Sequence, residues 1–124
     1  MGKKVIVVDD SRTARQQVKS ALVGAGYEIV EAVDGADGIL KMDANADAVL
    51  VLCDVNMPIL GGIDMIEQLK RDGKGANHTF VMLTTEAEPD LVQRAKACGA
   101  KGWIVKPFKP ELLLAAVRKL VGEA

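Results

Sequence analysis

The sequence predicts an α/β protein with a doubly wound, five-stranded parallel sheet and helices on both faces. Two observations carry this prediction. Five short apolar runs alternate along the chain with five segments of helical character, and most of those runs are continuously apolar. Continuous apolar runs are typical of strands that are buried on both faces, as in parallel sheets. The helices between them supply the crossover connections that parallel pairing requires.

The five predicted strands are short, and each ends close to a polar residue. In chain order they cover Val5–Val8, Tyr27–Ala32, Ala48–Cys53, Thr79–Leu83 and Trp103–Val105. Asp54 directly follows the third strand, Thr84 the fourth and Lys106 the fifth.

Caps and periodicity locate the five helices. We expect the first to follow Ser11 and to run to about Ala25, where Gly26 ends it. Asp34 is the expected cap of the second helix, and Pro89 and Pro110 suit the first turns of the fourth and fifth. The residues expected on the buried faces are Ala14, Val18, Ala21 and Leu22, then Ala36, Ile39 and Leu40, then Met65, Ile66 and Leu69, and finally Leu113, Leu114, Val117 and Leu120.

Length and composition limit the classes of protein that the chain can represent. Its 124 residues suit one domain, with 49% hydrophobic and 27% charged residues, so we expect a single domain over residues 1–124 without an output domain. The net charge of −1 gives no support for binding to nucleic acid or to acidic lipid. No apolar run approaches membrane-spanning length, and two cysteines form no disulfide framework. We expect a cytoplasmic protein that acts through its own surface.

Five chemically active side chains stand where apolar strands end. They are Asp9, Asp10, Asp54, Thr84 and Lys106. In a parallel sheet the carboxyl ends of the strands lie along one edge, where ligands bind, so these side chains are expected to converge. A cluster of acids there can hold a divalent cation, and a cation with a lysine and a hydroxyl can hold a phosphoryl group.

Each of these residues also has a purely structural explanation. Asp9 and Asp10 could cap a helix, but a cap needs only one acid. Two like charges about 4 Å apart repel by roughly 4 kcal/mol at an effective dielectric of 20, and Asp54 adds to this repulsion. A Mg²⁺ ion reverses the sign of that interaction and favours a few carboxylates with waters and phosphate oxygens. Lys106 could be solvated and Thr84 an ordinary strand end, but their places beside the acids favour a functional role.

Four segments together resemble the receiver domain of two-component response regulators. They are Val5–Ser11 (VIVVDDS), Leu52–Gly62 (LCDVNMPILGG), the strand end Leu83–Thr85, and Gly102–Phe108 (GWIVKPF). The resemblance extends over the whole chain, with the motifs in the family's order. It implies a flavodoxin-like fold with strand order 2-1-3-4-5. The last segment is most similar to the single-domain chemotaxis type, the CheY-like proteins.

The resemblance implies a role for each strand-end residue. Asp54 resembles the aspartate that accepts a phosphoryl group from the phosphohistidine of a sensor histidine kinase. Asp10, Asp54 and the backbone carbonyl of Asn56 resemble the ligands of Mg²⁺, with Mn²⁺ as an alternative ion, and Asp9 acts mainly through a metal-bound water. Thr84 and Lys106 resemble the hydroxyl and ammonium that bind the phosphoryl oxygens.

The resemblance also implies residues that control the signal. Asn56 and Glu86 flank the expected path of the hydrolytic water, so they are expected to tune the lifetime of the acyl phosphate. Trp103 stands where the family has a switch aromatic, usually Tyr or Phe, and we expect it to move from solvent toward Thr84 on activation. The bond between Lys106 and Pro107 resembles one that is cis in the family.

Several functions remain open from the sequence alone. The implied partners are a histidine kinase, a downstream target such as the flagellar motor switch, and a phosphatase. A phosphorelay intermediate and a phosphate sink would carry the same residues. A haloacid-dehalogenase-like phosphatase also uses Asp, Mg²⁺, Thr and Lys, but its second acid is replaced here by Asn56. A flavin-binding module of the same fold would be coloured when purified and would have no use for the acids.

Overall fold

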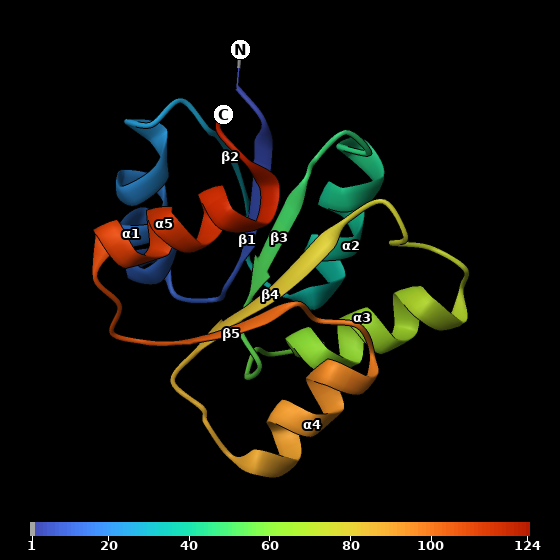
Figure 1. Ribbon diagram of the computed structural model, residues 1–124. Helices are drawn as coiled ribbons and strands as arrows, with labels where there is room; N and C mark the ends of the chain where they lie inside the picture. The colour runs from blue at the N-terminus through green and yellow to red at the C-terminus, as the bar shows by residue number, and fades with distance from the viewer. Residues whose placement is uncertain (1) are drawn as a thin grey trace.

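The computed structural model describes residues 2–124, in which five strands alternate with five helices (Figure 1). The elements in chain order are β1 Lys4–Val8, α1 Arg12–Val23, β2 Glu28–Ala32, α2 Gly35–Ala44, β3 Leu50–Cys53, α3 Gly62–Arg71, β4 Thr79–Thr84, α4 Pro89–Ala97, β5 Gly102–Val105 and α5 Pro110–Val121.

The strands form one parallel sheet in the order β2-β1-β3-β4-β5, as the resemblance implied. The register aligns the strand ends that carry the predicted site. Val8 at the end of β1 pairs with Cys53 at the end of β3, and the amide of Asp54 donates to the carbonyl of Val8 at 3.0 Å. On the other side of β4, the amide of Lys106 donates to the carbonyl of Thr84 at 2.8 Å. The fold therefore presents these residues at one edge of the sheet.

Helices cover both faces of the sheet, α1 and α5 on one face and α2, α3 and α4 on the other (Figure 1). Alternate residues of each central strand enter separate cores, because successive side chains of a strand point to opposite faces. Val5 and Val7 of β1 pack on the α1 and α5 side, whereas Ile6 and Val8 pack on the opposite side. This two-sided burial explains why the central strands are continuously apolar in sequence.

The predicted elements agree with the structure in kind and order, and most boundaries differ by one or two residues. The first helix ends at Val23 instead of Ala25, and Gly26 adopts a φ of 98° in the turn that follows. Asp34 caps α2 as predicted, since its side chain accepts a hydrogen bond from the amide of Asp37. In α5, Leu113 and Val117 are buried as predicted, but Leu120 is 39% exposed.

The predicted buried face of α2 is wrong for Ala36 and Leu40, whereas Ile39 is partly buried and packs against the core as predicted. Ala36 and Leu40 face solvent, and Leu40 is 65% exposed. The helix instead turns Gly35, Gly38 and Met42 inward. A Cβ atom at Gly38 would lie 2.9 Å from Sδ of Met65 and 3.1 Å from the methyl carbons of Val8. Because α2 approaches the sheet this closely, glycine takes the place that periodicity assigned to larger apolar residues.

Helix α4 is attached less firmly than its neighbours. Ala95 is its one buried residue, whereas α3 buries five. Arg94 ties it to α3 through ion pairs to Asp64 at 3.0 Å and Glu67 at 2.7 Å, both on the surface.

Two consecutive glycines let the loop after β3 close tightly on the sheet edge. A Cβ at Gly61 would lie 2.4 Å from the carbonyl oxygen of Val55, and one at Gly62 would lie 2.2 Å from the carbonyl oxygen of Asp54. Real Cβ atoms do not approach backbone atoms so closely, so a side chain at either position would displace the segment that carries Asp54.

We predict that Gly62→Ala lowers the free energy of unfolding by roughly 1–3 kcal/mol, because the added methyl overpacks a rigid backbone contact. Gly24→Ala is the control, since a Cβ at Gly24 has open space around it and φ is −62°. The control is expected to be neutral or slightly stabilising. Urea unfolding measures both changes, and equal stabilities for the two variants would contradict the packing described here.

Candidate functional site

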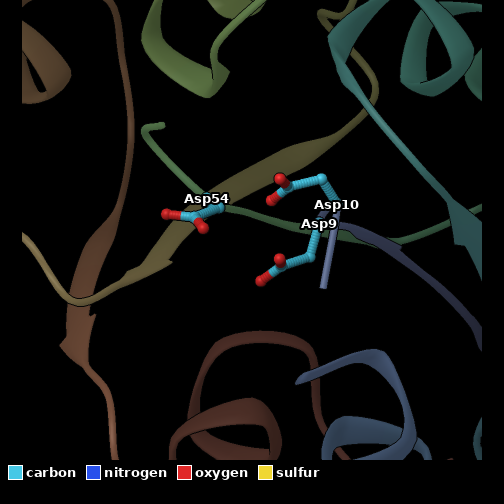
Figure 2. Close-up of side chains that lie close together, drawn as sticks. All are labelled: Asp9, Asp10 and Asp54. Carbon is cyan, nitrogen blue, oxygen red and sulfur yellow. The ribbon is translucent and has the colours of Figure 1, made fainter. Parts of the chain in front are cut away.

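Three carboxylates converge at the carboxyl edge of the sheet, as the sequence predicted. Asp9 and Asp10 follow β1 and Asp54 follows β3, on neighbouring strands (Figure 2). One carboxylate oxygen from each lies within 4.8 Å of the others. Asp9 and Asp54 are buried, whereas Asp10 is exposed. This arrangement concentrates negative charge at a point that solvent or a ligand reaches from the Asp10 side.

Lys106 connects the two buried carboxylates. Its Nζ donates to Oδ2 of Asp9 at 2.7 Å and to Oδ2 of Asp54 at 3.3 Å, and its side chain is only 13% exposed. Burial alone would lower the pKa of Lys106, but the hydrogen bond and charge of Asp9, with a smaller contribution from Asp54, raise it above its usual value. The lysine therefore remains an ammonium and offsets part of the repulsion between the acids.

Asp9 is fully engaged by the protein. Its Oδ1 accepts from the amide of Ser11 at 2.9 Å, and its Oδ2 accepts from Lys106. Burial raises the pKa of Asp9, and the hydrogen bonds from Lys106 and Ser11 only partly oppose that increase. With both oxygens occupied, this carboxylate is less available as a direct metal ligand than its two neighbours.

Asp54 and Asp10 have carboxylate oxygens that accept no hydrogen bond from the described residues. Across residues 2–124, Oδ1 of Asp54 is the buried side-chain polar atom that has no hydrogen-bond partner. A buried carboxylate oxygen without a partner is costly, and a hard cation is the group that would satisfy it. Asp10 makes no side-chain hydrogen bond among the contacts of the described residues and faces solvent. The donor set therefore fits a divalent cation that prefers oxygen ligands.

Asn56 and Glu86 join the loops that follow β3 and β4. Nδ2 of Asn56 donates to Oε1 of Glu86 at 2.7 Å, so an amide and a carboxylate meet across the loops that follow β3 and β4. Thr84 is the last residue of β4 and is fully buried. Its Oγ1 accepts from the amide of Glu86 at 3.2 Å, which joins the predicted hydroxyl to the same loop.

Trp103 does not rest in solvent, contrary to our expectation. The side chain is half-buried and packs against the core on the α2, α3 and α4 side. Its Nε1–H donates to the carbonyl oxygen of Glu86 at 2.9 Å. The indole nitrogen supplies a donor that reaches the loop after β4, and this bond explains why the ring lies inward. The peptide bond between Lys106 and Pro107 is cis.

Two contributors escaped the sequence analysis. Ser11 was expected only as a helix cap, but besides capping α1 through its side chain it donates its amide to Asp9. Arg15 on α1 donates to the carbonyl oxygen of Asp9 at 2.7 Å. Its position inside a helix resembles that of any solvated arginine, so only the tertiary structure reveals this contact.

Comparison with known families identifies the class of protein. A family model described as the response regulator receiver domain matches residues 5–118, which is most of the chain. The chain belongs to the response regulator receiver family. Membership supports a signalling domain rather than a haloacid-dehalogenase-like phosphatase or a flavin-binding module.

Individual relatives are chemotaxis proteins. The chain is 37% identical over 120 residues to the chemotaxis protein CheY1 of Helicobacter pylori, covering 96% of this chain and 97% of that protein. Its fold matches that of the chemotaxis protein CheY4 of Vibrio cholerae with a TM-score of 0.88 and 38% identity, over 98% and 100% of the two chains. It also matches a chain from the CheX-CheY-BeF₃-Mg²⁺ complex of Borrelia burgdorferi, with a TM-score of 0.84 and 27% identity, over 94% and 87%.

In residues 2–124 none of the helices combines the length and the apolar character needed to cross a membrane.

We predict that Asp10→Asn raises the thermal midpoint by roughly 2–5 °C in the presence of a chelator, because it removes one of three clustered negative charges. The same change is expected to abolish the stabilisation that added Mg²⁺ gives the unmodified chain. Differential scanning calorimetry with and without Mg²⁺ measures both effects.

Glu28→Gln serves as the control, since Glu28 is an exposed acid at the opposite edge of the sheet. Glu28→Gln is expected to change neither the thermal midpoint in chelator nor the stabilisation by Mg²⁺. An Asp10→Asn variant that gains as much stability from Mg²⁺ as the unmodified chain would show that these acids do not form the metal site.

Proposed function

We propose that the chain is a stand-alone response regulator that accepts a phosphoryl group on Asp54 and signals by protein–protein interaction. The observation that carries this proposal is the state of the Asp54 carboxylate. Lys106 holds one of its oxygens, and the other is buried without a partner. The side chain is thus fixed in position, and its free oxygen can act on a ligand that enters the site.

The negative charge of the site and of the phosphoryl donor explains why phosphoryl transfer requires a cation there. The donor is an anionic phosphoryl group, and it approaches three carboxylates. Asp10, Asp54 and the backbone carbonyl of Asn56 would hold Mg²⁺, or Mn²⁺ in its place, with Asp9 acting through a water. The ion would offset the carboxylate charge and the charge of the phosphoryl oxygens. Lys106 supplies a second positive charge at the same point, which favours transfer by the electrostatic means common to phosphoryl-transfer sites.

A chain of hydrogen bonds provides a route from the site to the surface. The Thr84 hydroxyl accepts a hydrogen bond from the amide of Glu86. The carbonyl oxygen of Glu86 in turn accepts a hydrogen bond from the indole of Trp103. When the Thr84 hydroxyl turns toward the phosphoryl oxygens, it alters the support of the loop that holds the indole. Trp103 then shifts further toward the space beside Thr84, and the surface formed by α4, β5 and α5 changes.

The lifetime of the signal depends on water reaching the acyl phosphate. Asn56 and Glu86, on the loops that follow β3 and β4, are hydrogen-bonded to each other. Because these two side chains border the approach to Asp54, they tune the rate of hydrolysis. The chain catalyses only its own phosphorylation and dephosphorylation and has no separate substrate.

The relatives suggest the pathway. Helicobacter pylori CheY1 and Vibrio cholerae CheY4 are chemotaxis proteins, and each is covered almost completely by this chain. We therefore favour a cytoplasmic chemotaxis regulator, a single domain over residues 1–124, that a histidine kinase phosphorylates and that acts on the flagellar motor switch. A phosphatase is the third partner that we propose, and the similar CheY chain of Borrelia burgdorferi occurs in a complex with a second protein, CheX. No nucleic acid or membrane partner is proposed.

We predict that acetyl phosphate with Mg²⁺ phosphorylates the chain on Asp54 and that Asp54→Asn abolishes labelling, because the amide cannot form the acyl phosphate. Intact-mass spectrometry after trapping the modified protein measures the extent of labelling. Asp64→Asn, an exposed acid in the first turn of α3, is the control and is expected to retain labelling. Label that persists in Asp54→Asn would contradict the assignment.

We predict that beryllofluoride, which mimics the acyl phosphate, shifts the emission of Trp103 to the blue when Mg²⁺ is present and leaves it unchanged without Mg²⁺. Trp103 is the single tryptophan, so the signal reports one position. The shift is expected to be modest because the indole is already half-buried. Thr84→Ala removes the linking hydroxyl and is expected to weaken the response. Identical emission in the phosphorylated and unmodified chains would show that Trp103 does not switch.

A further inference from the structure

Arg15 has no part in the function proposed above, yet its side chain is as buried as that of Asp54. It lies on the inner side of α1 with 12% of its side chain exposed, the same fraction as the Asp54 side chain. Burying a guanidinium is unfavourable unless its donors are satisfied, so its partners indicate what holds it in place.

Arg15 joins two strands at the edge of the sheet that carries the site. Its Nε donates to Oε1 of Glu31 at 3.0 Å, and its Nη1 donates to the backbone carbonyl oxygen of Asp9 at 2.7 Å. Glu31 belongs to β2, where it pairs with Val7 of β1, two residues before Asp9. A planar guanidinium that donates in two directions fixes the distance between these partners in a way that a single ammonium cannot.

The carbonyl that Arg15 holds controls the next residue. A peptide unit is planar, so the carbonyl of Asp9 and the amide nitrogen of Asp10 lie in one rigid plane. Fixing the carbonyl oxygen therefore restrains the plane that carries the Asp10 Cα, and so the point from which the Asp10 side chain starts. Asp9 has bonds of its own to Ser11 and Lys106, whereas no side-chain hydrogen bond of Asp10 occurs in the described part of the chain. Among hydrogen bonds of the described residues, only those of the adjoining backbone restrain the placement of Asp10.

We propose that Arg15 is a positioning residue that aims the Asp10 carboxylate at the cation through the Asp9 carbonyl, with Glu31 as its anchor. This inference rests on the proposed function, in which Asp10 is a metal ligand. Groups that orient metal ligands commonly contribute ten-fold or more to metal affinity.

The direction of the effect separates this role from a simple effect of charge. Arg15 is a cation close to a cation site, so removing it would tighten divalent metal binding if only Coulomb repulsion mattered. If Arg15 positions Asp10, removing it weakens binding instead. The two explanations therefore predict changes of opposite sign.

The test is a Mn²⁺ titration of the full chain followed by electron paramagnetic resonance, which measures the free ion directly and needs no phosphoryl transfer. We expect Arg15→Gln to weaken Mn²⁺ binding about ten-fold or more. Arg12→Gln is the matched control, because it removes the same charge from an exposed position on the same helix, where the structure gives it no partner among residues 2–124. The control is expected to bind as tightly as the unmodified chain or slightly more tightly.

If circular dichroism shows that Arg15→Gln does not fold, a second variant provides the test. Arg15→Lys keeps the charge and loses the two-directional donor, and it is also expected to bind Mn²⁺ more weakly than the unmodified chain. If the folded variant, Arg15→Gln or otherwise Arg15→Lys, binds Mn²⁺ as tightly as the unmodified chain or more tightly, the role of Arg15 is overturned. An unmodified chain that binds no Mn²⁺ would overturn the proposed function itself, and the role of Arg15 with it.

Discussion

The structure depends on one electrostatic arrangement, the ion pairs of Lys106 with the carboxylates of Asp9 and Asp54. Two buried acids on neighbouring strands would otherwise repel each other in a setting where water screens little. Lys106 reaches both from the end of β5 and joins the centre of the sheet to its edge. The lysine reduces the repulsion without removing it, since one ammonium faces three carboxylates, and Oδ1 of Asp54 is still without a partner. That imbalance is what a cation or a phosphoryl group would correct.

The parallel sheet makes this arrangement attainable. Val8 and Cys53 are paired in register, so Asp9 and Asp54 leave adjacent strands at the same level. The loop after β3 then closes over them through Gly61 and Gly62, where any side chain would strike the backbone. Packing and chemistry are therefore coupled in this loop, because the contact that stabilises the start of α3 also sets the position of the segment that carries Asp54.

The strands and the strand-end acids could be predicted because both leave unambiguous local patterns. A run such as Val5–Val8 has few explanations other than a buried strand, and charged residues directly after such runs must meet at one edge. The inward face of α2 could not be predicted in this way. Leu40 satisfies helical periodicity as well as Met42 does, and only the close approach of Gly38 to Val8 decides between them. The contact of Arg15 with Asp9 could not be predicted for a related reason, since the group that Arg15 binds there is a backbone carbonyl, which leaves no trace in sequence.

Helix α4 shows how local stability can be distributed to suit signalling. It buries one residue, and its ion pairs to α3 lie on the surface, where such pairs contribute little. Elements with few buried contacts open at lower free energy than the rest of a domain and exchange their amide hydrogens sooner. The helix beside Trp103 is therefore the one that the core restrains least. The loop before α4 holds the indole through the Glu86 carbonyl. A small change in that loop can therefore displace α4 at a low free-energy cost, without a change in the sheet.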